Sequence, residues 1–165
     1  MTEPPAPSQP VVRLAAEEAD QADRAAAFSV RHTVFVVEQG VPLELERDDR
    51  DAGADHFVAV VDGRPVGAVR LVVEPAGFEG VPVEHGPVAH LGRLAVLAHA
   101  RGSGLGALLV RAVEDRATER GLRLVYLGAQ THALGFYERL GYHAYGEQFD
   151  DAGLPHRHML RLLGR

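Results

Sequence analysis

The run Arg101-Gly102-Ser103-Gly104-Leu105-Gly106 has the composition of an anion-binding turn. Alternate glycines let the backbone approach a ligand closely, so that several amide groups can point at one anion. Apolar residues at helical spacing follow, and the first amides of a helix have no intrahelical partner. These amides, with the partial positive charge of a helix N-terminus, predict a diphosphate site. Arg101 would add a charged donor.

Two other phosphate-binding patterns do not fit this turn. Its glycines are not spaced Gly-x-Gly-x-x-Gly, and no acidic residue follows about twenty positions later at the end of a parallel strand. The chain has no Gly-Lys-Ser/Thr sequence either, since all 17 of its basic residues are arginine. The turn therefore favours neither a dinucleotide nor a nucleoside triphosphate.

The hydrophobic pattern predicts the elements that hold the turn in place. We expect the order β α β β β α β α β β along the chain. The predicted strands lie near residues 11–14, 56–61, 65–73, 90–97 and 122–127, from 142 onward, and at 156–163. The predicted helices cover 17–38, with a break possible inside, the stretch from 105 to a stop at Gly121, and 132–140. Residues 40–55 are acidic and irregular and are expected to form a loop.

Length and composition exclude several classes of protein. The 165 residues suit one domain at 11–165, preceded by a mobile Pro-rich tail at 1–10. Cysteine is absent, which excludes disulfides and thiolate chemistry. A net charge of −6 argues against nucleic-acid binding. No apolar run approaches the roughly 18–20 residues that span a bilayer, and the start lacks a signal region, so we predict a cytoplasmic protein without membrane contact.

Two segments carry a resemblance to a known family. His90-Leu91-Gly92-Arg93-Leu94-Ala95-Val96, followed by Arg101-x-x-Gly104-x-Gly106, resembles the acetyl-coenzyme A motif of the Gcn5-related N-acetyltransferase (GNAT) superfamily. The second part of the family pattern is met by Ala133, Phe136, Tyr137, Gly141 and Tyr142. Gln130 stands where that pattern usually has Asn.

Further segments resemble the ElaA-like branch of this superfamily. They are residues 34–39, 126–132 and 151–156, so the resemblance spans nearly the whole chain after the tail. It implies an α/β (α+β) fold: one domain with a mixed, mostly antiparallel sheet, a splayed central strand pair and flanking helices. It also implies transfer of an acetyl group from coenzyme A to a primary amine by direct attack in a ternary complex.

The resemblance implies a set of site residues. The coenzyme-binding residues would be Leu94, Ala95, Val96, Arg101, Gly102, Ser103, Gly104, Leu105, Gly106, Gln130 and Phe136. Tyr137 matches the family tyrosine near the sulfur, so we predict it as the general acid for the leaving thiolate. The general base stays open. Glu38 and His132 are the first candidates, and His90, His156 and the acidic residues of 40–55 are others.

The acceptor is expected to be a small-molecule or peptide amine. Residues 40–55 and 74–87 are the loops predicted to shape its pocket. No metal site is predicted, because the nine histidines include no His-Glu-x-x-His pattern. The resemblance leaves the oligomeric state open, with a homodimer as one option.

Two alternatives to an N-acetyltransferase remain. One alternative is an acyl-homoserine-lactone synthase. Three patterns weakly resemble that family: Arg31-x-x-Val34-Phe35, Glu46-x-Asp48 and Gly67-x-x-Arg70. A noncatalytic acyl-coenzyme A sensor would keep residues 101–106 but have no use for Tyr137.

Overall fold

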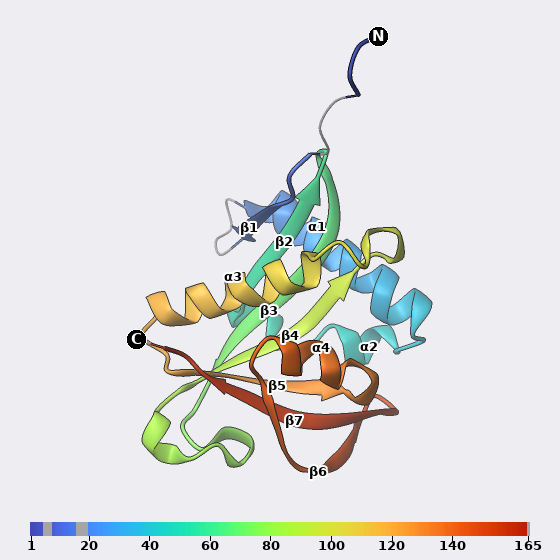
Figure 1. The fold of residues 1–165 in the computed structure, drawn as a ribbon. Coiled ribbons are helices and arrows are strands. Elements are labelled where there is room, and N and C mark those ends of the chain that lie inside the picture. The colour runs from blue at the N-terminus through green and yellow to red at the C-terminus, as the bar shows by residue number, and fades with distance from the viewer. Residues whose placement is uncertain (5–7, 16–19, 165) are drawn as a thin grey trace.

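A single seven-stranded sheet forms the centre of the protein in a computed structural model, which describes residues 1–4, 8–15 and 20–164 (Figure 1). The strand order is β1-β2-β3-β4-β5-β7-β6. The strands are β1 (Val11–Ala15), β2 (Asp55–Val61), β3 (Arg64–Glu74), β4 (Val88–Val96), β5 (Leu124–Gln130), β6 (His143–Asp151) and β7 (Leu154–Leu162). Only the β4–β5 pair is parallel within this sheet. The predicted mixed, mostly antiparallel sheet is therefore confirmed.

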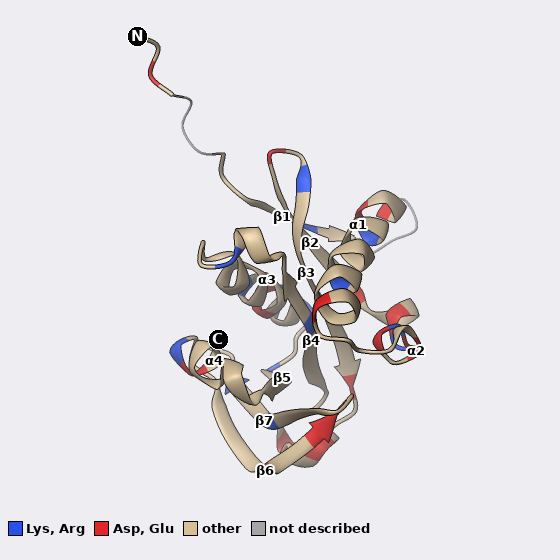
Figure 2. Cartoon of the chain, turned by 90° about the vertical axis from the view of Figure 1, so that its right-hand side faces the viewer, with Lys and Arg blue, Asp and Glu red and all other residues tan. Residues whose placement is uncertain are grey.

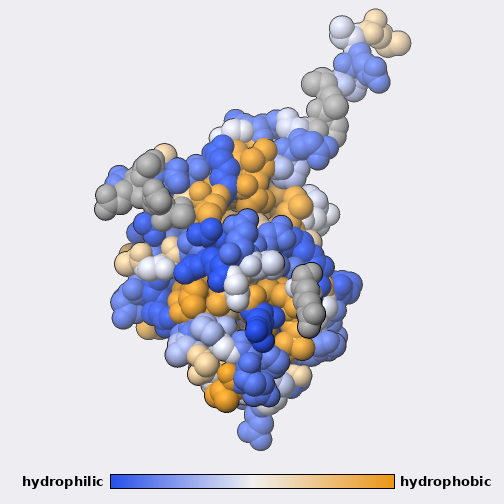
Figure 3. Space-filling model, turned by 90° about the vertical axis from the view of Figure 1, so that its left-hand side faces the viewer, coloured by the Kyte–Doolittle hydropathy of each residue, from blue (hydrophilic) through white to orange (hydrophobic). Residues whose placement is uncertain are grey.

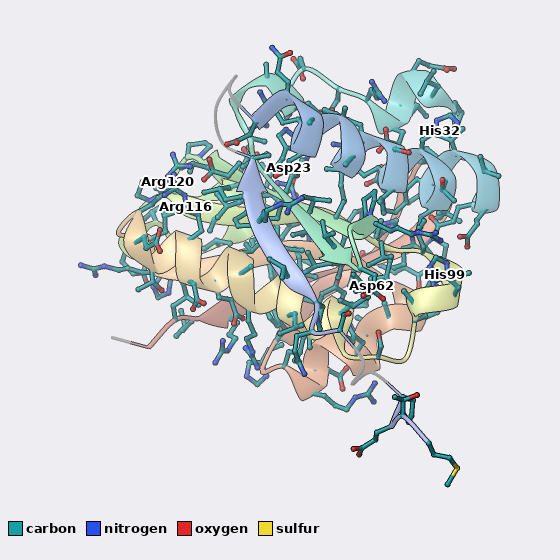
Figure 4. All side chains as sticks on the ribbon, turned by 90° about the horizontal axis from the view of Figure 1, so that it is seen from above. Asp23, His32, Asp62, His99, Arg116 and Arg120 are labelled. Atoms are coloured by element: carbon teal, nitrogen blue, oxygen red, sulfur yellow. The ribbon has the colours of Figure 1, made fainter. Side chains whose placement is uncertain are left out.

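Helices cover both faces of the sheet. The α-helices are α1 (Gln21–Arg31), α2 (Leu43–Glu46), α3 (Leu105–Glu119) and α4 (Leu134–Arg139). Seen from above, α1 and α3 lie on opposite sides of the strands (Figure 4). Near the end of α3, Arg116 and Arg120 lie together (Figure 4) and bind one carboxylate oxygen of Asp55 at 2.9 and 3.0 Å. These ion pairs join α3 to the start of β2.

The alternation of side chains along the strands divides the core between the two faces. Leu91 of β4 and Leu127 of β5 point to the α3 face, where they pack with Leu109 and Val113. Their strand neighbours point the other way. On that second face α1 packs against β2 and β3, and a smaller apolar cluster that includes Tyr126 lies beneath the segment after β3. In the middle of β4 and β5, side chains with odd residue numbers thus point to the α3 face, and those with even numbers point to the opposite face.

The predicted helix over 17–38 is two helices of different kind. Its first residues, 17–19, lie outside the described part of the chain. The α-helix α1 continues directly into a π-helix, His32–Glu38. Within the predicted loop over 40–55 there are two short helical turns, α2 and a 3₁₀ turn at Asp51–Gly53. The strongly acidic composition of this segment predicts a loop. The turns form because arginines from distant elements neutralise the carboxylates, and the sequence does not show these partners.

Buried ion pairs hold the acidic segment against the sheet. Arg31 of α1 is 1% exposed and binds Glu46 at 2.6 Å and Asp51 at 2.7 Å. Arg70 of β3 binds Asp48 at 2.6 Å and Asp51 at 2.8 Å. Burial alone would raise the pKa of Asp51, but the two arginines lower it well below its usual range. Figure 2 shows acidic and basic residues side by side around α2. This segment is therefore fixed by charge pairing, and it forms one wall of the site described below.

We predict that His56 makes the fold less stable in mild acid. Burial lowers the pKa of His56, although its Nε2 donates a hydrogen bond to the Asp51 carbonyl at 2.8 Å; Arg24 and Arg31 lower the pKa further. The unfolded chain therefore takes up a proton below about pH 6.5 that the native state resists. Stability falls as the pH falls, by at most about 1.4 kcal/mol per pH unit.

The variant His56→Gln tests this prediction, because glutamine is neutral and keeps a hydrogen-bond donor. Thermal melts at about pH 7.5 and 5.5 should show a smaller loss for His56→Gln than for the wild type. An equal loss would contradict this assignment.

The surface mixes apolar and hydrophilic residues. On the left-hand face of Figure 1, apolar residues are exposed in patches bordered by hydrophilic ones (Figure 3). Such patches are ordinary, since polar atoms are too few to cover a folded chain. In the part of the chain that the structure describes, no helix is long and apolar enough to cross a membrane.

Candidate active site

A cleft of about 380 Å³ opens where β4 and β5 diverge. The two strands pair only through Ala89 with Val125 and His90 with Tyr126. Beyond this point they separate, as Figure 1 shows. The β5-facing edge of β4 from residue 91 onward is therefore not paired with β5. An extended ligand can bind such an edge as an added strand does.

A β-bulge in β4 accompanies the divergence. Gly92 pairs with Arg70 and Ala95 with Ala68, so Arg93 and Leu94 together oppose one residue of β3. Arg93 has φ +53°, which costs backbone energy for a residue other than glycine. Its guanidinium compensates by donating to the carbonyls of residues 45 and 46 at 3.2 and 3.1 Å. The acidic segment therefore fixes the shape of the strand that borders the cleft.

The turn at residues 101–106 presents free amides at the start of α3. Gly104 is the N-cap with φ +85°, and the first cap bond runs from the Leu108 amide to the Gly104 carbonyl. No backbone or side-chain acceptor among the described residues bonds the amides of residues 102–107. Nothing lies within 4 Å of a Cβ built on Gly104, so the turn faces open space. The predicted anion site therefore has unsatisfied donors and room for a ligand.

Arg101 does not stand free beside this turn. Its Nε donates to the Val96 carbonyl at 2.9 Å, and its Nη2 donates to both oxygens of Glu38 at 3.0 and 2.8 Å. Glu38, the first candidate for the base, therefore lies against the turn. It is not among the residues that line the cleft. Arg101 thus links Glu38, at the end of the π-helix, to Val96, at the end of β4.

Most of the other predicted coenzyme-binding residues fall into two groups. Leu94, Gln130 and Phe136 line the cleft. Phe136 also connects the cleft to the turn, because its ring lies 3.1 Å from a Cβ built on Gly106. In contrast, the side chains of Ala95 and Leu105 are buried in the core, so only their backbone groups can contact a ligand.

Gln130, which replaces the usual Asn, has both ends of its amide occupied. Its nitrogen donates to Gln39 at 3.0 Å, and its oxygen lies 2.7 Å from Nε2 of His132. His132 lines the cleft, and donation from Nε2 leaves Nδ1 as the nitrogen that can accept a proton. His132 therefore stays a candidate for the base, held in place by Gln130.

Tyr137 lies in α4 at the wall of the cleft and is 8% exposed. Burial raises the pKa of Tyr137 above its ordinary value, so the phenol keeps its proton at neutral pH. Among the described residues, no hydrogen-bond partner for its hydroxyl is found, whereas the hydroxyl of neighbouring Tyr142 donates to Glu114 at 2.9 Å. A protonated, unengaged phenol in a cleft can serve as a proton donor.

One wall of the cleft contains aromatic residues that motif reasoning did not single out. Phe78, Tyr126 and Phe149 line it, together with His90 and His156. The predicted pocket loops both contribute, 40–55 through Val41, Leu45 and Glu46 and 74–87 through Phe78 and Glu79. In the sequence, this wall was indicated by segments 126–132 and 151–156, which resemble the ElaA-like branch, and by His90 and His156 as candidate bases, whereas Phe78 and Phe149 had no such signal. Across the described residues, no group of three or more His, Asp or Glu side chains could hold a metal ion.

The comparisons with known proteins agree with this geometry. Residues 18–142 match the family model described as the acetyltransferase (GNAT) family. This match covers well over half of the chain, so the chain belongs to the GNAT family of acetyltransferases and is an acyltransferase.

Individual relatives and a solved structure show which members of the family this chain is similar to. The uncharacterized N-acetyltransferase YjcF of Bacillus subtilis strain 168 is 37% identical over 136 residues, which cover 82% of this chain and 89% of YjcF. The protein ElaA of Escherichia coli K12 is 29% identical over 138 residues, covering 82% and 85% of the two chains. A crystal structure of an acyl-CoA N-acyltransferase from Pseudomonas aeruginosa superposes with TM-score 0.74 and 30% identity, covering 93% of this chain and 99% of that one. The similarity to ElaA inferred from sequence segments is thus confirmed.

Proposed function

We propose that this protein transfers an acetyl group from acetyl-coenzyme A to a primary amine, by direct attack of the amine within a ternary complex. The observation that carries the proposal is the run of free amides at residues 102–107, which leads through Phe136 to a cleft that Tyr137 lines. The family match and the similarity to N-acetyltransferases support it.

The residues present fit coenzyme A. The turn supplies donors for a diphosphate, and the edge of β4 beyond residue 90 supplies backbone groups for an extended pantetheine arm. Residues 94–96 lie on this edge, although the Val96 carbonyl already accepts from Arg101. The coenzyme would therefore run from the turn into the cleft.

Three tasks remain for side chains once both substrates are bound. Holding the amine against the thioester removes an entropic cost that can reach roughly 7–11 kcal/mol. A base must take a proton from the amine before attack, because only the neutral amine has a free lone pair. As the carbon–sulfur bond breaks, Tyr137 donates its proton to the sulfur and is later reprotonated. Tyr137 is the general acid of this proposal.

A noncatalytic acyl-coenzyme A sensor is the second candidate, and it makes a different prediction. We would incubate the protein with acetyl-coenzyme A and, separately, spermidine, glucosamine or a lysine-containing peptide, and measure free thiol. The chain has no lysine side chain of its own to consume the donor. Thiol release that depends on the added amine would support the transferase. Coenzyme uptake by calorimetry without thiol release would support the sensor, and no uptake would contradict both.

A further inference from the structure

A chain of titratable groups lies at the joined end of β4 and β5. The Tyr126 hydroxyl oxygen is 2.6 Å from Nδ1 of His158, and Nε2 of that ring is 3.9 Å from a carboxylate oxygen of Glu79. Tyr126 lines the cleft, His158 is largely buried behind it, and the side chain of Glu79 is 47% exposed. Tyr126 and His158 thus connect the inner wall of the cleft to the half-exposed carboxylate of Glu79, which lies at the border of the same cleft.

Ring packing fixes the orientation of His158. Its imidazole stacks on Phe149 with centroids 4.3 Å apart and on Tyr145 at 5.4 Å. The register of β5 with β7 places His158 opposite Gly128, two residues from Tyr126 on the same face. With the Tyr126 hydroxyl donating to Nδ1, neutral His158 carries its own proton on Nε2, directed at Glu79. This tautomer can accept a second proton at Nδ1 and share the resulting charge with the carboxylate.

The surroundings of Tyr126 favour a cation in the cleft. Burial first, and then the carboxylates of Glu79, Asp151 and Glu74 together with Tyr145, raise the pKa of Tyr126, so the phenol holds its proton. The cleft is also lined by Glu46, Arg70 and Arg93. These belong to the ion-pair network of the acidic segment, in which Arg31, Arg70 and Arg93 are matched by Glu46, Asp48 and Asp51. Because Glu74 is paired with Arg50, Glu79 and Asp151 are the main sources of negative potential near Tyr126.

Two rings complete this wall. Phe78 meets Tyr126 edge to face at 5.3 Å, and its π face can attract an ammonium group. His90 packs against Tyr126 at 5.0 Å, and burial lowers the pKa of His90, so it adds no positive charge that would repel a cation.

We infer that Tyr126 and His158 remove the proton of the acceptor, and that the acceptor is an aliphatic amine that arrives as an ammonium ion. This inference rests on the proposed acetyl transfer. The ammonium gives one proton to the Tyr126 oxygen while the Tyr126 proton moves to Nδ1 of His158. The products are a neutral amine and an imidazolium beside Glu79, which releases its proton to water. Tyr126 is the catalytic residue of this pair, and His158 acts through it.

The test separates proton removal from a structural role by comparing two nucleophiles. Spermidine and the lysine peptide are protonated at about pH 8.5, whereas hydrazine is mostly neutral there and needs no base before attack. Tyr126→Phe keeps the ring, and His158→Asn keeps an acceptor near Nδ1 without its basicity. Tyr142→Phe is the matched control, since it removes a phenol hydroxyl that donates to Glu114 and does not line the cleft.

Both variants should lower kcat/KM for the faster of spermidine and the peptide at least about tenfold, with the rate for hydrazine changed less than about threefold. Their affinity for coenzyme A should match the wild type, and Tyr142→Phe should keep wild-type rates for both nucleophiles. Equal losses for the amine and hydrazine, no loss for the amine, or wild-type activity with glucosamine alone would overturn the inference. These outcomes leave acetyl transfer intact. Failure of the wild type to bind coenzyme A or release thiol would instead overturn the proposed function, and this inference with it.

Discussion

Replacing Gly104 with Asp is expected to weaken coenzyme A binding about 10- to 100-fold, while Gly104→Asn weakens it far less. The N-cap at Gly104 lies among the free amides proposed to hold the diphosphate. A carboxylate placed about 5 Å from a phosphate repels it by about 1–3 kcal/mol at an effective dielectric constant of roughly 20–80. Isothermal calorimetry with coenzyme A measures the difference directly.

The Asn variant is the matched control because it differs from Asp almost only in charge. Both side chains tolerate a positive φ better than most, and the open space at Gly104 admits either of them. A negative charge at a helix N-terminus stabilises the helix by about 0.3–1 kcal/mol, so the Asp variant should melt no lower than the Asn variant. Equal affinity of the two variants for coenzyme A would show that the diphosphate does not bind at this turn.

Tyr137→Phe is expected to lower turnover about a hundredfold or more, with the affinity for coenzyme A nearly unchanged. General acids typically contribute about 10²–10⁴ to a rate. The change removes only the hydroxyl, and no partner of that hydroxyl is found among the described residues, so the packing of the ring should persist. Steady-state rates of thiol release, measured with the best amine of the panel, give the comparison.

Tyr142→Phe supplies the control for this experiment. Its ring lies 5.9 Å from that of Tyr137, but its hydroxyl is bonded to Glu114 and it does not line the cleft. We expect Tyr142→Phe to reduce stability and leave turnover near the wild-type value. If Tyr137→Phe retained full turnover, the thiolate would leave without a donor, and Tyr137 would have no role as an acid.

Part of the candidate site could be predicted from patterns within short stretches of the sequence. The turn at residues 101–106 joins a strand to a helix, and its glycines, free amides and helix start all lie within a few residues of one another. The loops predicted to shape the pocket do line the cleft. The helix carrying Phe136 and Tyr137 was likewise predictable, because its apolar spacing and its stop at Gly141 are local properties.

Contacts between distant segments decided the rest. From the sequence, residues 40–55 are expected to form an acidic loop whose carboxylates are candidate bases. In the structure, Asp48 and Asp51 form ion pairs with Arg31 and Arg70, which belong to other elements. Glu38, a candidate for the base, is paired with Arg101, 63 positions away in the sequence, and nothing in the sequence indicates this pairing. Charge type is visible in a sequence, whereas the identity of the partner depends on how elements pack.

The sequence by itself determined the fold family, and it predicted the glycine-rich turn at residues 101–106 and the aromatic pair at Phe136 and Tyr137, since each follows from spacing along one stretch of chain. Only the tertiary structure placed His158 behind Tyr126, because the register between β5 and β7 decides which side chains share a face. A shift of that register by one residue would move His158 to the opposite face of the sheet. The candidate proton path is therefore a property of strand pairing.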